Sequence, residues 1–179
     1  MPKSTAGGTP VLGAMCAILL AFSTEASAGR SDKQEVEPFY RSYNAEIECL
    51  ATAVYFEARG EPVKGQIAVA NVILNRVESP YYPDTICGVV YQNSHRRNAC
   101  QFSFACDGKT KKITETKAYK TAKALAQKIF ACDEECHASA LPIARSTHYH
   151  ADYVTPRWAK KLERTGKIGR HIFYYTASM

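Results

Sequence analysis

The chain lacks an apolar run long enough to cross a membrane as a helix. The apolar stretch from Val11 to Phe22 holds about a dozen residues, whereas a spanning helix needs about 20. Lys3 precedes this stretch, and residues 26–28 read Ala-Ser-Ala, which is the small-residue pattern of a cleavage site. These features together are typical of a secretory signal peptide. We therefore expect residues 1–28 to be a signal peptide and the protein to be exported without stable membrane insertion.

Two common signatures of hydrolytic enzymes are also missing from the sequence. It contains no H-E-x-x-H motif, which would place two zinc ligands and a general base on one helix. Ser103 is not flanked by the glycines of a nucleophile elbow. These absences argue against a serine hydrolase and remove the usual sequence support for a zinc hydrolase.

Internal repeats and low-complexity tracts are absent as well. The part of the chain that follows the signal peptide is of a length that fits one domain with its own core. Its first residues are polar and charged, so we expect a flexible leader over 29–45 and a single folded domain over 46–179.

The charge of the chain is basic, with a formal net value of +6. Removal of the signal peptide takes away Lys3 and Glu25, which cancel, so the exported protein keeps this charge. A basic exported protein is suited to an anionic polymer such as cell wall peptidoglycan, lipid headgroups or nucleic acid. The positive residues are scattered, so a solvated basic surface explains them equally well.

Six of the seven cysteines lie after the signal peptide: Cys49, Cys87, Cys100, Cys106, Cys132 and Cys136. An even number in an exported chain favours disulfides over reactive thiols. Cys100 with Cys106, and Cys132 with Cys136, are close enough in sequence to close small loops. The pairing itself stays open, and a zinc cluster is the competing interpretation.

Hydrophobic spacing predicts helices in the first part of the chain. Asn44 can cap a helix that starts at Ala45 and ends before Gly60. A second helix, about Val63–Val77, is apolar nearly all round and is predicted to be buried. The remaining predicted helices are a short one capped by Asp84 or Thr85, one opening at Thr114 and Glu115, and a short one starting at Pro156.

The strands are predicted mainly in the second half of the chain. Residues 101–104 alternate in polarity as a strand does, and residues 147–150 and 171–175 are strand-like and aromatic. Helices first and a small antiparallel sheet afterwards define the α+β class.

Glu57 is the strongest catalytic candidate, because it lies on the apolar stripe of the first helix with Leu50 and Val54. Burial disfavours the charged carboxylate and raises its pKa, which turns a glutamate into a proton donor near neutral pH. The alternative is a structural partner for a buried cation, but Arg59 is on a different helical face. Glu61 would complete a carboxylate pair only if the helix continued past Gly60, so we interpret it as a supporting residue.

His148, His150 and His171 form a second candidate site. The first two share one face of a strand, and a paired strand could bring the third alongside to form an open zinc site. The alternative is that all three are ordinary core, cleft or edge residues.

Four sequence blocks, taken together, resemble one family. They read AVYFEARGEPVKGQIAVANVILNRVESPYYPDTICGVVYQ, CQFSFACDG, STHYHADYVTPRW and TGKIGRHIFYY, and they occur in the family's order from about Ile47 to Tyr175. The chain is thereby similar to the SleB-type cell wall hydrolases, named for spore-cortex-lytic enzymes.

The resemblance implies a lysozyme-like α+β domain that cleaves peptidoglycan and is related to lytic transglycosylases and resuscitation-promoting factors. It makes Glu57, the first glutamate of the E-A-R-G-E run, the catalytic acid, with no metal or other cofactor. The implied bond is the β-1,4 link between N-acetylmuramic acid and N-acetylglucosamine. A 1,6-anhydro product is expected, with attack by water, which gives a reducing end, as the hydrolytic variant.

The same blocks imply a set of substrate-binding residues. Phe102, Ser103 and Tyr149 match positions that border the glycan cleft, and Gln101 and His150 are expected as their neighbours. The expected partner is peptidoglycan and not nucleic acid. The chain differs from the spore enzymes in its short leader, with no wall-binding module, and in its cysteines, which favours a periplasmic protein of a Gram-negative cell. The alternatives are a zinc-dependent N-acetylmuramoyl-L-alanine amidase and a non-catalytic peptidoglycan-binding protein.

Overall fold

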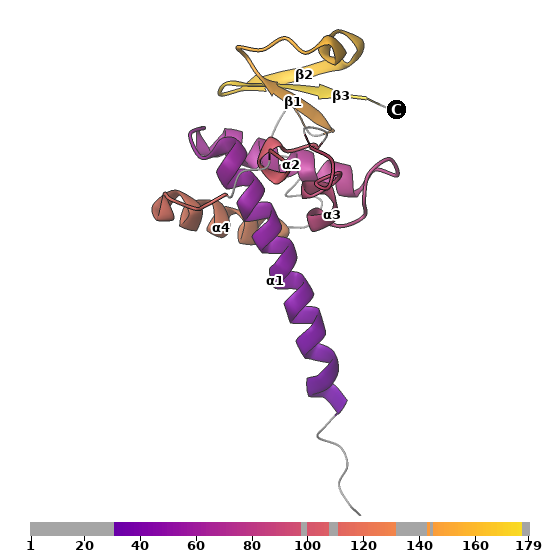
Figure 1. Ribbon diagram of the computed structural model, residues 1–179, viewed down its shortest axis with the longest axis vertical. Helices are drawn as coiled ribbons and strands as arrows, with labels where there is room; N and C mark the ends of the chain where they lie inside the picture. The colour runs from indigo at the N-terminus through magenta and orange to yellow at the C-terminus, as the bar shows by residue number, and fades with distance from the viewer. Residues whose placement is uncertain (1–30, 98–99, 108–110, 132–142, 144, 177–179) are drawn as a thin grey trace, which may run out of the picture.

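The computed structural model describes residues 31–97, 100–107, 111–131, 143 and 145–176. A group of helices is followed by one small sheet (Figure 1). The elements are α1 Ser31–Ala58, α2 Val63–Val77, α3 Ile86–Val90, η1 Ser103–Ala105, α4 Thr116–Phe130, β1 His148–Ala151, η2 Arg157–Lys161, β2 Glu163–Ile168 and β3 His171–Tyr175. The predicted α+β class, with helices first and the sheet afterwards, is confirmed.

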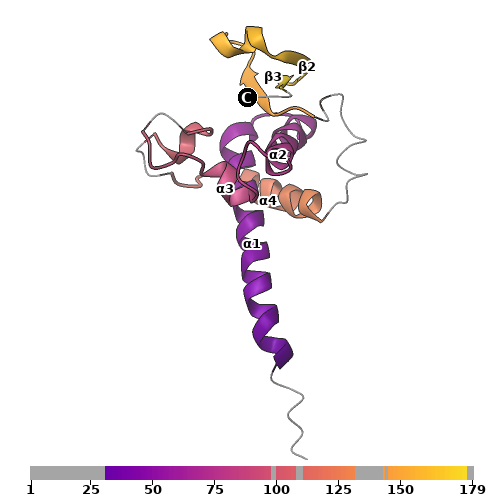
Figure 2. The same ribbon diagram turned by 90° about the vertical axis from the view of Figure 1, so that its right-hand side faces the viewer.

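Helix α1 is longer than the sequence pattern predicts. It begins at Ser31, so Asn44 lies inside the helix and the segment expected to be a flexible leader is largely helical. Its first half projects away from the other elements, as both views show (Figures 1 and 2). A capping residue marks where a helix can start, but it does not prevent a helix from continuing toward the N-terminus. The predicted end of the helix is confirmed, because α1 stops at Ala58.

The core lies where the second half of α1 meets α2, α3 and α4. The predicted stripe is buried there, with Leu50, Val54 and Ala58 almost fully inaccessible. Helix α2 is buried on nearly every side, as its uniform apolar sequence predicts. Helix α4 follows Glu115, and its inward face includes Ala122 and Ile129. These contacts fix the end of α1, which carries Glu57.

The three-stranded sheet is antiparallel, with the strand order β1-β3-β2. Strands β1 and β3 confirm the two strands predicted from aromatic alternation. Strand β2 had not been predicted, because its sequence ERTGKI is polar and mostly exposed. Phe173 of β3 packs against Ala68 and Val72 of α2, which anchors the sheet on the helices. The predicted short helix after Pro156 is the 3-10 helix η2.

Residues 101–104 do not form the predicted strand. Cys100 and Cys106 are joined by a disulfide with a Cα–Cα distance of 6.0 Å, whereas six residues in extended conformation would span about 20 Å. The segment therefore turns back on itself, and Ser103–Ala105 forms one 3-10 turn. The alternating pattern reflects the burial of Phe102 and Phe104 on one side of this loop.

A second disulfide joins Cys49 of α1 to Cys87 of α3 across 38 positions of the chain. The four cysteines of these two bonds are therefore not ligands of a zinc cluster. Cys132, Cys136 and the predicted signal peptide lie outside the described residues. Within the described part of the chain, no helix is long and apolar enough to cross a membrane.

Candidate active site

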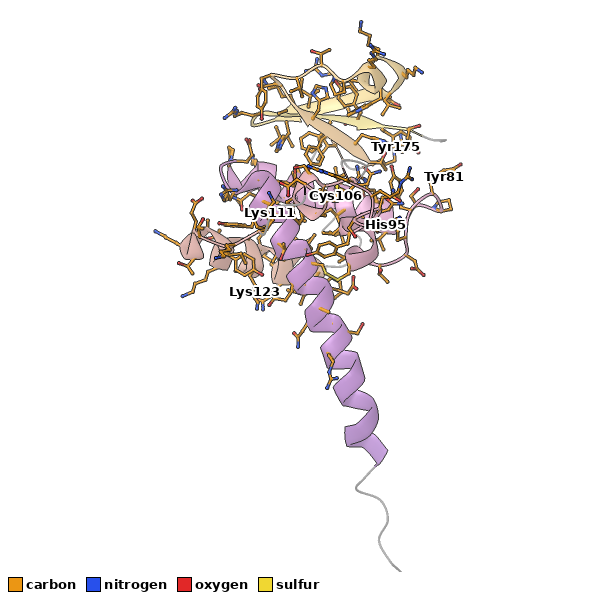
Figure 3. The ribbon with its side chains drawn as sticks, in the orientation of Figure 1. Tyr81, His95, Cys106, Lys111, Lys123 and Tyr175 are labelled. Carbon is orange, nitrogen blue, oxygen red and sulfur yellow. A yellow bond between two sulfur atoms is a disulfide. The ribbon has the colours of Figure 1, made fainter. Side chains whose placement is uncertain are left out.

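A cleft of about 350 Å³ lies where the end of α1 faces the edge of the sheet. Side chains from the sheet and from the helices extend into the space between these two layers (Figure 3). The residues that line the cleft come from the end of α1 and the turn after it, the residue before α4, the end of β1 and the loop after it, and the β2–β3 turn with the start of β3: Phe56, Glu57, Arg59, Gly60, Glu61, Glu115, Ala151, Tyr153, Arg170 and His171.

Glu57 is one of three carboxylates that line this cleft. Burial raises its pKa above the usual range for a glutamate. Two smaller effects act in the opposite direction: the Tyr149 hydroxyl donates a hydrogen bond to Oε2 at 3.2 Å, and the positive charge of Arg76 favours the ionised form. The net upward direction is the one that suits a proton donor.

Tyr149 reaches Glu57 from the central part of β1. Its ring lies against Phe173 at 5.9 Å and His171 at 5.0 Å between centroids, which holds it in place. Burial raises the pKa of the Tyr149 phenol well above its usual value, and the nearby Glu57 adds to this effect. The hydroxyl therefore stays protonated and available as a donor.

Arg76 is a buried cation behind the site. It is not among the site residues predicted from the sequence. Its side chain is only 4% exposed, and its Nε donates a hydrogen bond to the carbonyl of Thr147 at 2.8 Å, next to β1. The guanidinium lies over the rings of Tyr82 and Phe102, and Nη1 has no hydrogen-bond partner among the described residues. The signal that could have identified it is an arginine on a helix that is otherwise predicted to be buried.

Glu61 does not pair with Glu57 as a second carboxylate. Its Oε2 accepts a hydrogen bond from the backbone N–H of Arg170 at 2.9 Å, in the β2–β3 turn. Its backbone carbonyl accepts a hydrogen bond from Gln66 at 3.1 Å. In this position Glu61 connects the end of α1 to the sheet.

The predicted substrate-binding residues at 101–103 do not line the cleft. Gln101 and Ser103 are exposed, and Phe102 is only 1% exposed and lies in the core under Arg76. Phe102 therefore presents no surface to a sugar in this structure, and it supports the site from behind. The same loop contacts the cleft wall through Phe104, which stacks on Phe56 at 5.0 Å.

The three histidines are not brought to one face of the sheet. In the register of β1 with β3, His148 faces Tyr174, and His150 faces Ile172, whereas His171 faces Ala151 on the opposite side. His150 bonds to the Tyr174 hydroxyl at 3.0 Å on the outer face, away from Glu57. Burial, assisted by Arg76, lowers the pKa of His148 to about 4. Of the three, only His171 lines the cleft.

Comparison with known proteins identifies the class. A sequence profile described as Cell Wall Hydrolase matches residues 60–174. The chain is 35% identical over 129 residues to the spore cortex-lytic enzyme of Halalkalibacterium halodurans, and 36% identical over 129 residues to that of Bacillus cereus, with 72% of this chain covered in each case. It spans 34% and 43% of the length of these two relatives. The chain belongs to the cell wall hydrolase family.

Solved structures support the same assignment. The catalytic domain of the Bacillus cereus SleB protein aligns with a TM-score of 0.51 and 34% identity, and covers 72% of this chain and 88% of that one. The catalytic domain of the germination-specific lytic transglycosylase SleB from Bacillus anthracis aligns with a TM-score of 0.52 and 36% identity, and covers 72% and 93%. The family profile begins at Gly60, just after Glu57, so a role for Glu57 depends on the geometry of the site.

Proposed function

We propose that this protein cleaves peptidoglycan glycan strands at the β-1,4 bond between N-acetylmuramic acid and N-acetylglucosamine, as a lytic transglycosylase with Glu57 as its catalytic residue. The observation that carries the proposal is that Glu57, a carboxylate whose pKa is raised by burial, lines a cleft. The likeness to catalytic domains of SleB proteins, one of them described as a lytic transglycosylase, supports the same chemistry.

The reaction needs only one carboxyl group. Protonated Glu57 donates its proton to the glycosidic oxygen while the bond from that oxygen to C1 of the muramyl residue breaks and the sugar gains oxocarbenium character. The carboxylate then removes the proton from the 6-hydroxyl of the same sugar as that oxygen bonds to C1. The product is a 1,6-anhydro ring, Glu57 is protonated again, and no water is consumed.

Nearby carboxylates in the cleft are already engaged. Glu61 accepts the N–H of Arg170, and Glu115 forms an ion pair with Arg59 at 2.7 Å. These contacts occupy both carboxylates, so neither supports a role as a second catalytic carboxylate. The N-acetyl group of the substrate itself is the partner that can shield the developing positive charge on the sugar.

Replacing Arg76 with glutamine is expected to move the alkaline limb of the pH–activity profile to higher pH. Glu57 acts as an acid only while it is protonated, so activity falls as the pH rises through its pKa. The charge of Arg76 lowers that pKa, and its loss leaves the effect of burial less opposed. The measurement is kcat/KM across pH, with Arg76→Lys as the control that keeps the charge. Equal shifts in the two variants would show that charge is not the cause.

Export to the periplasm is part of the proposal. The pattern of a signal peptide over residues 1–28 and the disulfides Cys49–Cys87 and Cys100–Cys106 support an oxidising compartment outside the cytoplasm. Peptidoglycan lies in that compartment. The amidase alternative is not supported by a specific observation, because the register separates His171 from His148 and His150.

The mass of the released products tests the chemistry. Purified sacculi would be digested with the protein in water labelled with a heavy oxygen isotope, and the fragments would be analysed by mass spectrometry. We expect anhydro-muropeptides that are lighter by one water than reducing ones and that carry no heavy oxygen. Reducing ends with heavy oxygen would show hydrolysis, free stem peptides would show an amidase, and intact sacculi would refute the proposed activity.

A further inference from the structure

One rim of the cleft is formed by two loops of the sheet. Tyr153 lies in the loop after β1 and is 72% exposed, which is unusual for a large aromatic side chain. The guanidinium of Arg170, in the β2–β3 turn, lies over its ring at 5.2 Å from the centroid. Both residues line the cleft that contains Glu57. The rim therefore presents an aromatic ring and a cation side by side.

This rim is held in place by several contacts. The backbone N–H of Asp152 donates to the carbonyl of Arg170 at 2.8 Å, and the carboxylate of Asp152 pairs with Lys167 at 2.7 Å. The N–H of Arg170 is bound by Glu61. Gly169 has a φ of +57°, in the left-handed region that favours glycine. The backbone under Arg170 is therefore fixed before a ligand binds.

The charge of Arg170 is available to a ligand. The other cation of the cleft lining, Arg59, is paired with Glu115 at 2.7 Å. Within the part of the chain that the structure describes, Arg170 forms no ion pair. A guanidinium offers a planar set of donors that matches the two oxygens of a carboxylate.

We propose that Tyr153 and Arg170 form a subsite for the muramyl residue of the glycan, in which the sugar stacks on the open face of Tyr153 and Arg170 binds a carboxylate that this residue carries. N-acetylglucosamine carries no carboxylate, so such a contact distinguishes the two alternating sugars. Where the muramyl residue carries a stem peptide, its lactyl carboxyl is an amide and the carboxylate is one in the stem. Where the stem has been removed, the carboxylate is that of the lactyl group. This inference depends on the proposed function, because it concerns the same cleft.

Three glycan substrates test the proposal with Arg170→Gln. The first is peptidoglycan with its stem peptides, the second is glycan stripped by an amidase, which leaves the lactyl carboxylate, and the third is peptidoglycan with its carboxylates amidated by carbodiimide. We expect KM to rise about five- to tenfold, with kcat changed less than about twofold, on at least one of the first two substrates, and KM on the amidated glycan to stay at the parent value. Arg170→Lys should recover part of the loss.

The control is Arg164→Gln, which removes the same charge from the opposite face of the sheet, where Arg164 faces Tyr174. It should leave KM unchanged on all three substrates. An effect of Arg170→Gln on KM for stripped glycan alone assigns the lactyl carboxylate, an effect on stem-bearing peptidoglycan alone assigns the stem peptide, and an effect on both shows that the site binds either carboxylate. Equal effects on charged and amidated glycan, or none on either, would overturn the proposal. Inactivity of the parent protein on every substrate would instead refute the proposed function.

Tyr153→Ala and Tyr153→Phe separate the aromatic contribution. Stacking depends on the face of the Tyr153 ring and not on the carboxylates of the substrate. Tyr153→Ala should therefore raise KM by a similar factor on all three substrates, while Tyr153→Phe should have the KM of the parent. An alanine variant with unchanged KM would remove Tyr153 from the subsite. Thermal unfolding of each variant checks that the exposed substitution has not altered the fold.

Discussion

Replacing Glu57 with glutamine is expected to lower kcat on peptidoglycan by about a thousandfold. The amide has nearly the same volume as the carboxyl group and can still accept the hydrogen bond that Tyr149 donates. It cannot protonate the glycosidic oxygen or take a proton from the 6-hydroxyl. The substitution thus removes both proton transfers and leaves the packing at the end of α1 in place.

The measurement combines release of soluble fragments from sacculi with a binding assay by co-sedimentation. The variant should bind sacculi as the parent does and release almost nothing. Glu48→Gln is the matched control on the same helix, because Glu48 pairs with Lys123, on the side of the helices away from the sheet (Figure 3). It should keep activity within about twofold. Normal release by the Glu57 variant would exclude Glu57 as the catalyst, and binding without release by the parent would identify a non-catalytic wall-binding protein.

Removal of the Cys49–Cys87 disulfide is expected to lower the free energy of unfolding by about 4 kcal/mol. The bond closes a long segment, with its ends 38 positions apart, and so restricts the unfolded chain strongly. It also joins α1 to α3 beside the core, where Ile86 and Val89 are buried. Replacement of both cysteines by alanine avoids leaving a free thiol.

Chemical denaturation of the double alanine variant measures this effect, and the midpoint of thermal unfolding should fall by roughly 10 °C. The matched control replaces Cys100 and Cys106, whose bond spans only six positions and should contribute about 2 kcal/mol. The difference between the two variants isolates the dependence on loop length. Equal losses, or a loss below about 1 kcal/mol for the longer loop, would contradict the chain-entropy argument.

The helical part of the fold could be predicted because its signals are local. Three of these signals are the uniformly apolar sequence of Val63–Val77, the glycine after α1 and the capping residue Thr85. Each depends on residues close in sequence, and the structure has α2 and α3 where these signals predict them. Thr85 accepts the N–H of Gly88 at 3.1 Å, as a capping residue does. The apolar stripe of α1, which predicted that Glu57 faces the core, also depends only on residues close in sequence.

The parts that could not be predicted depend on contacts between distant residues. Arg76 meets Thr147, which is 71 positions away, and no sequence pattern encodes that pairing. The alternation at 101–104 predicted a strand because the disulfide that closes the loop was one of several possible pairings. Strand β2 is polar and exposed, so its pairing with β3, and not its composition, makes it a strand.

The glycine in the β2–β3 turn also limits how the cleft can be redesigned. A Cβ atom at position 169 would lie 2.0 Å from Oε2 of Glu61, so any side chain there pushes the carboxylate away from the N–H of Arg170. The amino acids at positions 61 and 169 must therefore be chosen together, although the two positions are far apart in sequence. A new side chain in this turn requires the side chain of residue 61 to move or to be shortened, and the N–H of residue 170 then needs another acceptor.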